Sequence, residues 1–382
     1  MKVRYYGHHH LPTGYGRAAL ELAWALDRTD TALQVVAVGP QPPDVPWPIP
    51  GDLLEPIEQP DAVIVHTLPG DCHRVLEAAG LRRGEGPKLV AYTTWEALTA
   101  PLAVVQALYD SFDQVWVPSR ITGQALAANG LHGSGRDRES AERRTHVVPH
   151  CYDENAVQRS DKYSDAGKFR FYWVGAWTAR KNPAGLIRAF ANAFHPGTRA
   201  ELVLHSPGCS IDTFVATLAA TGLQQSELPP IVISNQHLTD SALAELHAQA
   251  DCFVSAARGE AWNLPAFDAL LAGRHVITQY GLGSDEFLSD TSADLIDGWE
   301  APAHVDVAAA SSGDGSVTFK TIGAQGLTAR SLWLEPNLSS LSNAMQSAYE
   351  IRKRTIKIDY DVASRFGYAA VANRVLELLE AP

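Results

Sequence analysis

The sequence predicts an α/β protein made of two doubly wound domains, each built around a parallel sheet. Strand-length apolar segments alternate with segments in which apolar residues recur every three or four positions, as in successive β-α-β units. This alternation stops in a polar stretch, residues 153–167, and then restarts. The chain has 382 residues, of which 46% are hydrophobic and 19% charged, so two cores of ordinary size can form.

The first alternation predicts six strands and four helices. The expected strands cover residues 3–6, 33–38, 62–65, 88–92, 114–117 and 145–148, and the expected helices cover 17–26, 73–79, 102–111 and 121–129. The Pro-rich stretch 40–50 and the charged, Gly-containing stretch 133–144 are expected to be exposed loops. Residues 1–155 form the expected N-terminal domain.

The second alternation predicts a further domain over residues 165–355. Its expected strands cover residues 169–174, 201–205, 231–234, 252–255 and 275–278, and its expected helices cover 184–193, 211–220, 240–249 and 266–271. Residues 311–316 are expected to be another exposed loop. The tail has a strong helical period over 362–379, and its apolar face has no other obvious place to bury. We therefore expect residues 361–382 to return to the N-terminal domain.

Composition limits the classes of partner. The net charge is −12, from 31 basic and 43 acidic residues, whereas proteins that bind phosphate backbones usually carry an excess of Lys and Arg. A nucleic-acid partner is therefore not favoured, although a local basic cleft keeps it open. Apolar runs are no longer than a strand, so no membrane span is expected, and peripheral membrane association stays open.

Cysteine usage and the N-terminus indicate a cytoplasmic protein. The four cysteines are far apart and form no CxxC pair, which argues against disulfides and structural zinc. The first seven residues lack the apolar stretch of a signal peptide.

The first candidate motif, Gly14-Tyr-Gly16-Arg-Ala-Ala19, fits G-x-G-x-x-A. A nicotinamide dinucleotide is disfavoured, because a loop separates the motif from its strand and no acidic residue follows the second strand. Two interpretations remain: a glycine turn that permits close helix packing, or a helix N-terminus that meets an anion.

The second motif, which runs from Val174 to Pro183, places Arg180 and Lys181 just before a helix that Pro183 begins. The helix dipole disfavours cations at this position, so the pair makes sense if an anion binds between the cations and the helix. The alternative is a solvated basic pair that folding does not need.

The third motif runs from Arg258 to Gly273. Glu260 lies in a loop and Asp268 lies about one turn into the following helix, so both carboxylates can face one crevice. The backbone N–H groups of Trp262, Asn263 and Leu264 can meet phosphate or sugar oxygens there.

Together these motifs resemble the retaining, nucleotide-sugar-dependent glycosyltransferases of the large group-1 family (family 4). That family has the GT-B fold, in which two Rossmann-like domains face each other across a cleft. Its E-x7-E signature falls on Glu260 and Asp268, and its diphosphate-binding element falls on 175–181, with an Arg-Lys-Asn-Pro form that matches one subgroup. Further matches lie at 115–119, 148–153 and 332–336.

The resemblance implies a retaining transferase that moves a sugar from a nucleoside diphosphate to a hydroxyl acceptor. Arg180 and Lys181 would neutralise the donor's diphosphate and, with Glu260, form the catalytic set. A donor phosphate oxygen would accept the acceptor's proton by a front-face mechanism, so neither a protein nucleophile nor a metal or other cofactor is expected. The remaining donor contacts implied are Gly14, Gly16, Gly175, Trp262, Asn263, Leu264 and Asp268, the last bonding the ribose hydroxyls.

This sequence departs from the family at three places. Asp268 replaces the usual Glu, Ala176 stands where many relatives carry Arg, and 91–96 replaces the usual acceptor-domain histidine segment. The candidates for acceptor or sugar contacts are His66, Glu96 and His150. Other interpretations stay open: a nucleotide-sugar epimerase or hydrolase of the same fold, transfer onto a nucleic-acid base, and a non-catalytic nucleotide-sugar-binding subunit.

Two metal-like patterns are interpreted otherwise. Adjacent residues of an extended His8–His10 segment point in different directions, so we expect a loop lining the cleft. Asp359-Tyr-Asp361 resembles the DxD motif of a different glycosyltransferase fold, but it precedes the terminal helix and is expected to be a solvated cap.

Overall fold

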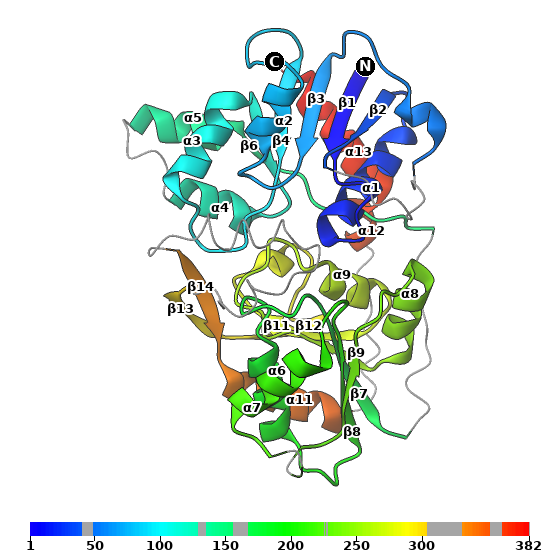
Figure 1. The fold of residues 1–382 in the computed structure, drawn as a ribbon, viewed down its shortest axis with the longest axis vertical. Helices are drawn as coiled ribbons and strands as arrows, with labels where there is room; N and C mark the ends of the chain where they lie inside the picture. Colours follow the sequence, from blue (N-terminus) through cyan, green and yellow to red (C-terminus); the bar gives the residue numbers. More distant parts are fainter. Residues whose placement is uncertain are drawn as a thin grey trace. The chain divides into compact units, whose positions relative to one another are not determined.

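The computed structural model describes residues 1–39, 49–128, 135–155, 167–224, 226, 228–303, 331–351 and 361–381. The chain divides into two compact units (Figure 1). Unit 1 comprises Met1–Ala156, Ala324–Ser331 and Tyr360–Pro382, and unit 2 comprises Val157–Gly323 and Leu332–Asp359. The loop expected at 311–316, most of the loops at 40–50 and 153–167, and Asp359 lie outside the described residues.

Unit 1 contains a parallel sheet of six strands in the order β2-β1-β3-β4-β5-β6. The strands are β1 (Lys2–Gly7), β2 (Ala32–Ala37), β3 (Ala62–His66), β4 (Lys88–Tyr92), β5 (Gln114–Val117) and β6 (Thr145–Val147). The helices are α1 (Gly14–Asp27), η1 (Gly51–Leu54), α2 (Cys72–Ala78), α3 (Leu102–Ser111), α4 (Arg120–Ala128), α5 (Gly135–Arg144), α12 (Asp361–Phe366) and α13 (Tyr368–Glu380). The strand order reverses between β1 and β3, which is the topological switch point of this sheet.

Unit 2 repeats this architecture with the order β12-β11-β10-β7-β8-β9. Its parallel strands are β7 (Phe169–Val174), β8 (Ala200–His205), β9 (Ile231–Ser234), β10 (Cys252–Val254), β11 (His275–Gln279) and β12 (Ala293–Ile296). Its helices are α6 (Pro183–Ala193), α7 (Ile211–Thr221), α8 (Asp240–Gln249), α9 (Leu264–Leu271), η3 (Gly283–Glu286) and α11 (Leu338–Ile351). Here the order reverses between β7 and β10.

The predicted fold class is therefore confirmed: both units are doubly wound parallel sheets with helices between their strands. Several elements were not predicted, namely β12, α11 and the antiparallel pair β13 (Gly298–Pro302) and β14 (Leu332–Pro336). In α11, the hydroxyl of Ser342 donates to the Ala189 carbonyl of α6 at 2.9 Å, and Leu341 and Met345 join the core of unit 2.

The prediction of an exposed loop over 133–144 is wrong for residues 135–144, which form α5. The Arg, Glu and Ala residues of this segment favour a helix, and tertiary contacts add to that preference. The Arg144 guanidinium donates to the carbonyls of Tyr109 and Phe112 at 2.9 and 3.1 Å and lies over the Tyr109 ring. Ala141 is buried on the same side of the helix.

The C-terminal helix returns to unit 1, as predicted, where α13 (red) packs beside α1 (blue) in Figure 1. Its buried face belongs to the same core as Tyr5 and Ile64 of the sheet. The sheet also contacts the helix end: Lys88 Nζ donates to the Leu379 carbonyl and Gln114 Nε2 to the Leu378 carbonyl, both at 2.9 Å. The single helix predicted over 362–379 is divided at Gly367, where the backbone is extended.

Because α13 completes the core of unit 1, truncating its buried side chains is expected to destabilise that unit. Leu378→Ala should cost about 2–5 kcal/mol, since the cavity adds to the lost transfer free energy. Asn373→Ala, on the exposed face of the same helix, should cost less than about 0.5 kcal/mol. Hydrogen exchange should rise in unit 1 and not in unit 2. Equal exchange for both variants would contradict this role of α13.

Candidate functional site

The switch point of unit 2 brings together two loops from distant parts of the sequence. One loop follows β7 and ends at Asn182, and the other follows β10 and ends at Asn263. In open α/β sheets, ligands bind where such loops diverge at the carboxyl ends of adjacent strands. The second and third motifs of the sequence lie on these two loops.

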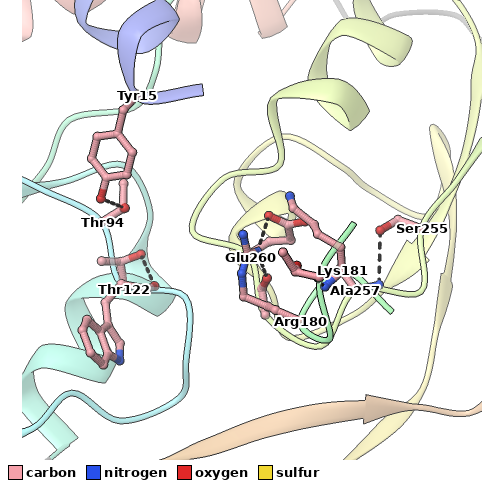
Figure 2. A network of polar contacts seen from close by, with 11 residues as sticks. Tyr15, Thr94, Thr122, Arg180, Lys181, Ser255, Ala257 and Glu260 are labelled. Atoms are coloured by element: carbon pink, nitrogen blue, oxygen red, sulfur yellow. Dashed lines mark hydrogen bonds and ion pairs between the residues drawn. The ribbon is translucent and has the colours of Figure 1, made fainter. Parts of the chain in front are cut away.

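Two cations of the β7 loop converge on one carboxylate of the β10 loop (Figure 2). Lys181 Nζ lies 2.5 Å from Glu260 Oε1, and Arg180 Nη1 lies 3.2 Å from Glu260 Oε2. The same Arg180 nitrogen donates to the Gly259 carbonyl at 2.5 Å. The structure thus joins the three residues that the sequence proposed as the catalytic set.

The Arg180–Lys181–Glu260 cluster is largely withdrawn from solvent. The exposed fractions of the side chains are 13% for Arg180, 13% for Lys181 and 4% for Glu260. A solvated basic pair is therefore the wrong interpretation. The group that faces both cations is the protein's own Glu260 carboxylate, and the bound anion that the sequence suggests stays a prediction. Within these three residues the two cations outnumber the carboxylate, and Lys and Arg side chains beside a helix N-terminus are groups that bind phosphate.

Both loops end in an asparagine with left-handed backbone conformation. Asn182 has φ 54° and caps α6, because its Oδ1 accepts the Gly185 N–H at 3.0 Å. Asn263 has φ 75° and precedes α9. Asparagine tolerates this conformation better than most residues. The Nδ2 atoms of both side chains are buried and have no hydrogen-bond partner among the described residues.

The β10 loop contacts η3. The Gly283 N–H donates to the Glu260 carbonyl at 2.8 Å. A Cβ at position 283 would lie 2.0 Å from the Ala261 carbonyl oxygen, so only glycine permits this close approach. The Trp262 indole packs against the rings of Phe267 and Phe287, with centroids 5.4 and 5.0 Å away. Trp262 is thus a core residue, and its proposed donor contact is through its backbone N–H.

Asp268 lies on α9 beside a histidine that the sequence analysis did not single out. Its Oδ2 is 3.9 Å from Nε2 of His247, which lies in the last turn of α8. The other ring nitrogen of His247 is 2.7 Å from the hydroxyl of Tyr172 on β7. The sequence could not indicate this contact, because a single histidine in an amphipathic helix does not show which carboxylate lies beside it.

The structure shows the local backbone contacts of the three glycines that were proposed for donor binding. Gly16 lies in the first turn of α1, where a Cβ would be 1.9 Å from the Leu11 carbonyl oxygen. Thr13 caps this helix by accepting the Gly16 N–H at 3.1 Å, and Gly14 is the first helical residue. Gly175 directly follows β7, and its N–H donates to the His205 carbonyl at 3.1 Å. Close packing thus explains Gly16, while the proposed donor contacts of Gly14, Gly16 and Gly175 stay predictions.

Two of the three candidates of unit 1, His66 and His150, belong to a group of stacked rings near that unit's own switch point. His66, at the end of β3, stacks on Tyr92 with ring centroids 4.1 Å apart, and His150 lies 6.4 Å from His66. Tyr5 contacts His66 Nδ1 at 2.6 Å, while His66 Nε2 has no hydrogen-bond partner among the described residues. His8 joins the loops after β1 and β3, with Nε2 2.7 Å from the Thr67 hydroxyl.

Burial keeps these imidazoles uncharged. The pKa of His9 is lowered to about 3, mainly by burial and to a smaller extent by the neighbouring His10 and His8. Burial also lowers the pKa of His150 to about 3, with a smaller contribution from Arg17. Glu96 follows β4 near Tyr15, whose hydroxyl pairs with that of Thr94 (Figure 2).

The described part of the chain contains no group of three or more His, Cys, Asp or Glu residues that could bind a metal ion. None of its helices combines the length and apolar character needed to cross a bilayer.

Comparison with known proteins identifies the fold. Sequence comparison finds no matching family model and no matching curated protein. Among solved structures, HepE of Anabaena in complex with UDP-glucose superposes with a TM-score of 0.61 at 14% identity, over 99% of each chain. The lipopolysaccharide outer core galactosyltransferase WaaB gives 0.61 at 9% identity, again over 99% of each chain.

The pneumococcal O-GlcNAc transferase GtfA, solved with UDP and GlcNAc, gives a TM-score of 0.56 at 13% identity. That match covers 84% of this chain and 56% of GtfA. These likenesses show that the chain has the GT-B fold, with two Rossmann-like units.

Because Lys181 is paired with the buried Glu260 carboxylate, we expect its substitution to lower the stability of unit 2. Lys181→Ala leaves Glu260 with one cation instead of two, and should destabilise unit 2 by about 1–3 kcal/mol. Lys168→Ala is the control, since the Lys168 side chain is 45% exposed and its Nζ lies 3.8 Å from Glu201 Oε2. This substitution should lower the free energy of unfolding by less than about 1 kcal/mol. Denaturant unfolding measures both. A Lys181→Ala protein as stable as the wild type would contradict the structural part of this role.

The buried histidines of unit 1 predict a loss of stability in acid. Below pH 6.5 the unfolded chain protonates these imidazoles, whereas the folded chain keeps His9 and His150 neutral to about pH 3. The unfolded state thus binds more protons, and unfolding becomes easier as the pH falls from 6.5 towards 3, by up to about 1.4 kcal/mol per pH unit and histidine. His150→Gln should flatten this dependence and exposed His195→Gln should not. Equal slopes would refute the assignment.

Proposed function

We propose that this protein is a glycosyltransferase that transfers a sugar from a nucleoside diphosphate sugar to a hydroxyl acceptor. The observation that carries the proposal is the Arg180–Lys181–Glu260 cluster at the switch point of unit 2. The fold supports it, because HepE was solved with UDP-glucose and GtfA with UDP and GlcNAc in the same architecture. Retention at the anomeric carbon, and membership of the group-1 family's Arg-Lys-Asn-Pro subgroup, are the finer parts of the proposal and rest on the motifs.

In this proposal the two cations act on the leaving group. Negative charge grows on the diphosphate as its bond to the sugar breaks, and charge-assisted bonds from Lys181 and Arg180 strengthen with it. Glu260 orients both cations before the donor binds, so little reorganisation is needed during the reaction. Asp268 bonds the ribose hydroxyls, and the N–H groups at the start of α9 contact phosphate or sugar oxygens.

Unit 1 is proposed to bind the acceptor. The neutral imidazoles of His66 and His150, together with Glu96, are the proposed contacts, since neutral ring nitrogens and carboxylates bond hydroxyl groups. No protein nucleophile is required, because a donor phosphate oxygen accepts the acceptor's proton in the front-face mechanism. The reaction needs no divalent metal, since the diphosphate's charge is met by Arg180, Lys181 and helix N-termini.

Titration calorimetry with UDP and a panel of nucleotide sugars, in buffer with EDTA, tests the proposal. The wild type should bind UDP, and Lys181→Ala should bind it more weakly. In a separate assay, Lys181→Ala should lower the turnover number with the nucleotide sugar that binds by about two to three orders of magnitude. Lys168→Ala should behave like the wild type. Failure to bind any nucleotide, or binding that depends on magnesium or manganese, would refute this assignment of the diphosphate.

Product analysis separates the alternatives. Consumption of the donor without acceptor, at the full rate, would indicate the hydrolase or epimerase; binding without any turnover would indicate the non-catalytic subunit. Transfer to an oligonucleotide would support the nucleic-acid acceptor. The proposed transferase instead requires a hydroxyl acceptor and gives a product of unchanged anomeric configuration.

A further inference from the structure

We propose that Arg258 and Glu335 position the cation-bearing loop of the site. Neither residue has a role in the proposed reaction, although Arg258 begins the third motif and Glu335 lies in the matched segment 332–336. This inference rests on the proposed function, because it concerns how the Arg180–Lys181–Glu260 cluster is kept in the geometry that the diphosphate requires.

The guanidinium of Arg258 binds two segments at once. Its Nε and Nη2 donate to the two carboxylate oxygens of Glu335 at 2.5 and 2.9 Å, a bidentate pair whose planar geometry only arginine provides. Its Nη1 donates to the carbonyl of Ala179 in the β7 loop. The side chain is 14% exposed, so water screens these contacts only partly.

The backbone of Arg258 joins the same segments. Its N–H donates to the Arg180 carbonyl at 2.7 Å, and its carbonyl accepts the Leu334 N–H at 2.9 Å. The strand β14 that carries Leu334 and Glu335 is itself paired with β13. One residue thus connects the β7 loop, the β10 loop and a two-stranded sheet.

These contacts fix the two residues that precede Lys181. Ala179 and Arg180 are each bonded through their carbonyls to Arg258, which lies two residues before Glu260. The main-chain bonds set the spacing of the two loops, and the guanidinium prevents the β7 loop from moving away from the carboxylate. A displacement of about 1 Å can lower a rate about a hundredfold, so such support matters for catalysis.

The test compares Arg258→Lys with Arg170→Lys. Lysine keeps the charge but cannot form the bidentate pair and the Ala179 bond together. Arg170 forms a simpler ion pair in the same unit, with Nε 2.7 Å from Glu201, at the start of β7 rather than at its end. Hydrogen exchange of residues 176–182 without nucleotide and calorimetry with UDP are the two measurements.

We expect faster exchange at 176–182 and an approximately tenfold weaker UDP affinity, with full binding stoichiometry, in Arg258→Lys only. Glu335→Gln, which keeps one acceptor oxygen, should show a smaller effect than Glu335→Ala. A merely structural role would lower the stoichiometry and leave the affinity of the folded fraction unchanged, and that result overturns the proposal, as does unchanged exchange. If the wild type binds no UDP, the proposed function fails, and exchange at 176–182 alone decides whether Arg258 positions the loop.

Discussion

The carboxylate of Glu260 is the constraint on which the site in unit 2 depends. A charged group that is 4% exposed is costly unless opposite charges and hydrogen bonds compensate for its lost hydration. Lys181 and Arg180 provide the charges, and the Gly283 N–H fixes the adjoining carbonyl. Burial of one carboxylate therefore joins two loops that are far apart in the sequence, and it orders two long cationic side chains before any ligand binds. The entropic cost of ordering them is met during folding.

The two units have the same topology and different chemistry at the same topological position. In unit 2 the loops at the switch point carry two cations and one carboxylate, those of Arg180, Lys181 and Glu260. In unit 1 the corresponding loops carry rings that burial keeps neutral, among them His8 against Thr67 and His66 against Tyr92. Fold alone therefore does not determine what each switch point can bind. The charge and protonation state of the loop side chains determine it, and these follow from burial in each unit separately.

Much of this arrangement could be predicted from the sequence, because alternating apolar periods and Pro183 at a helix start are local signals. The anion that faces Arg180 and Lys181 could not be identified, since Glu260 lies 79 positions after Lys181 and periodicity carries no information on such pairing. The contacts of Arg258 with Ala179 and Glu335 were hidden for the same reason. Helix α5 was missed because its charged, Gly-containing sequence was interpreted as a loop, although its Arg, Glu and Ala residues favour a helix.

The most direct test of the central claim, that the Arg180–Lys181–Glu260 cluster binds the diphosphate of a nucleotide donor, is a crystal structure of the wild-type protein with UDP. Phosphate oxygens should lie within hydrogen-bonding distance of Lys181 Nζ and of the Arg180 guanidinium, beside the start of α6. A UDP molecule whose phosphates lie away from both cations, with the Lys181–Glu260 pair unchanged, would contradict that claim.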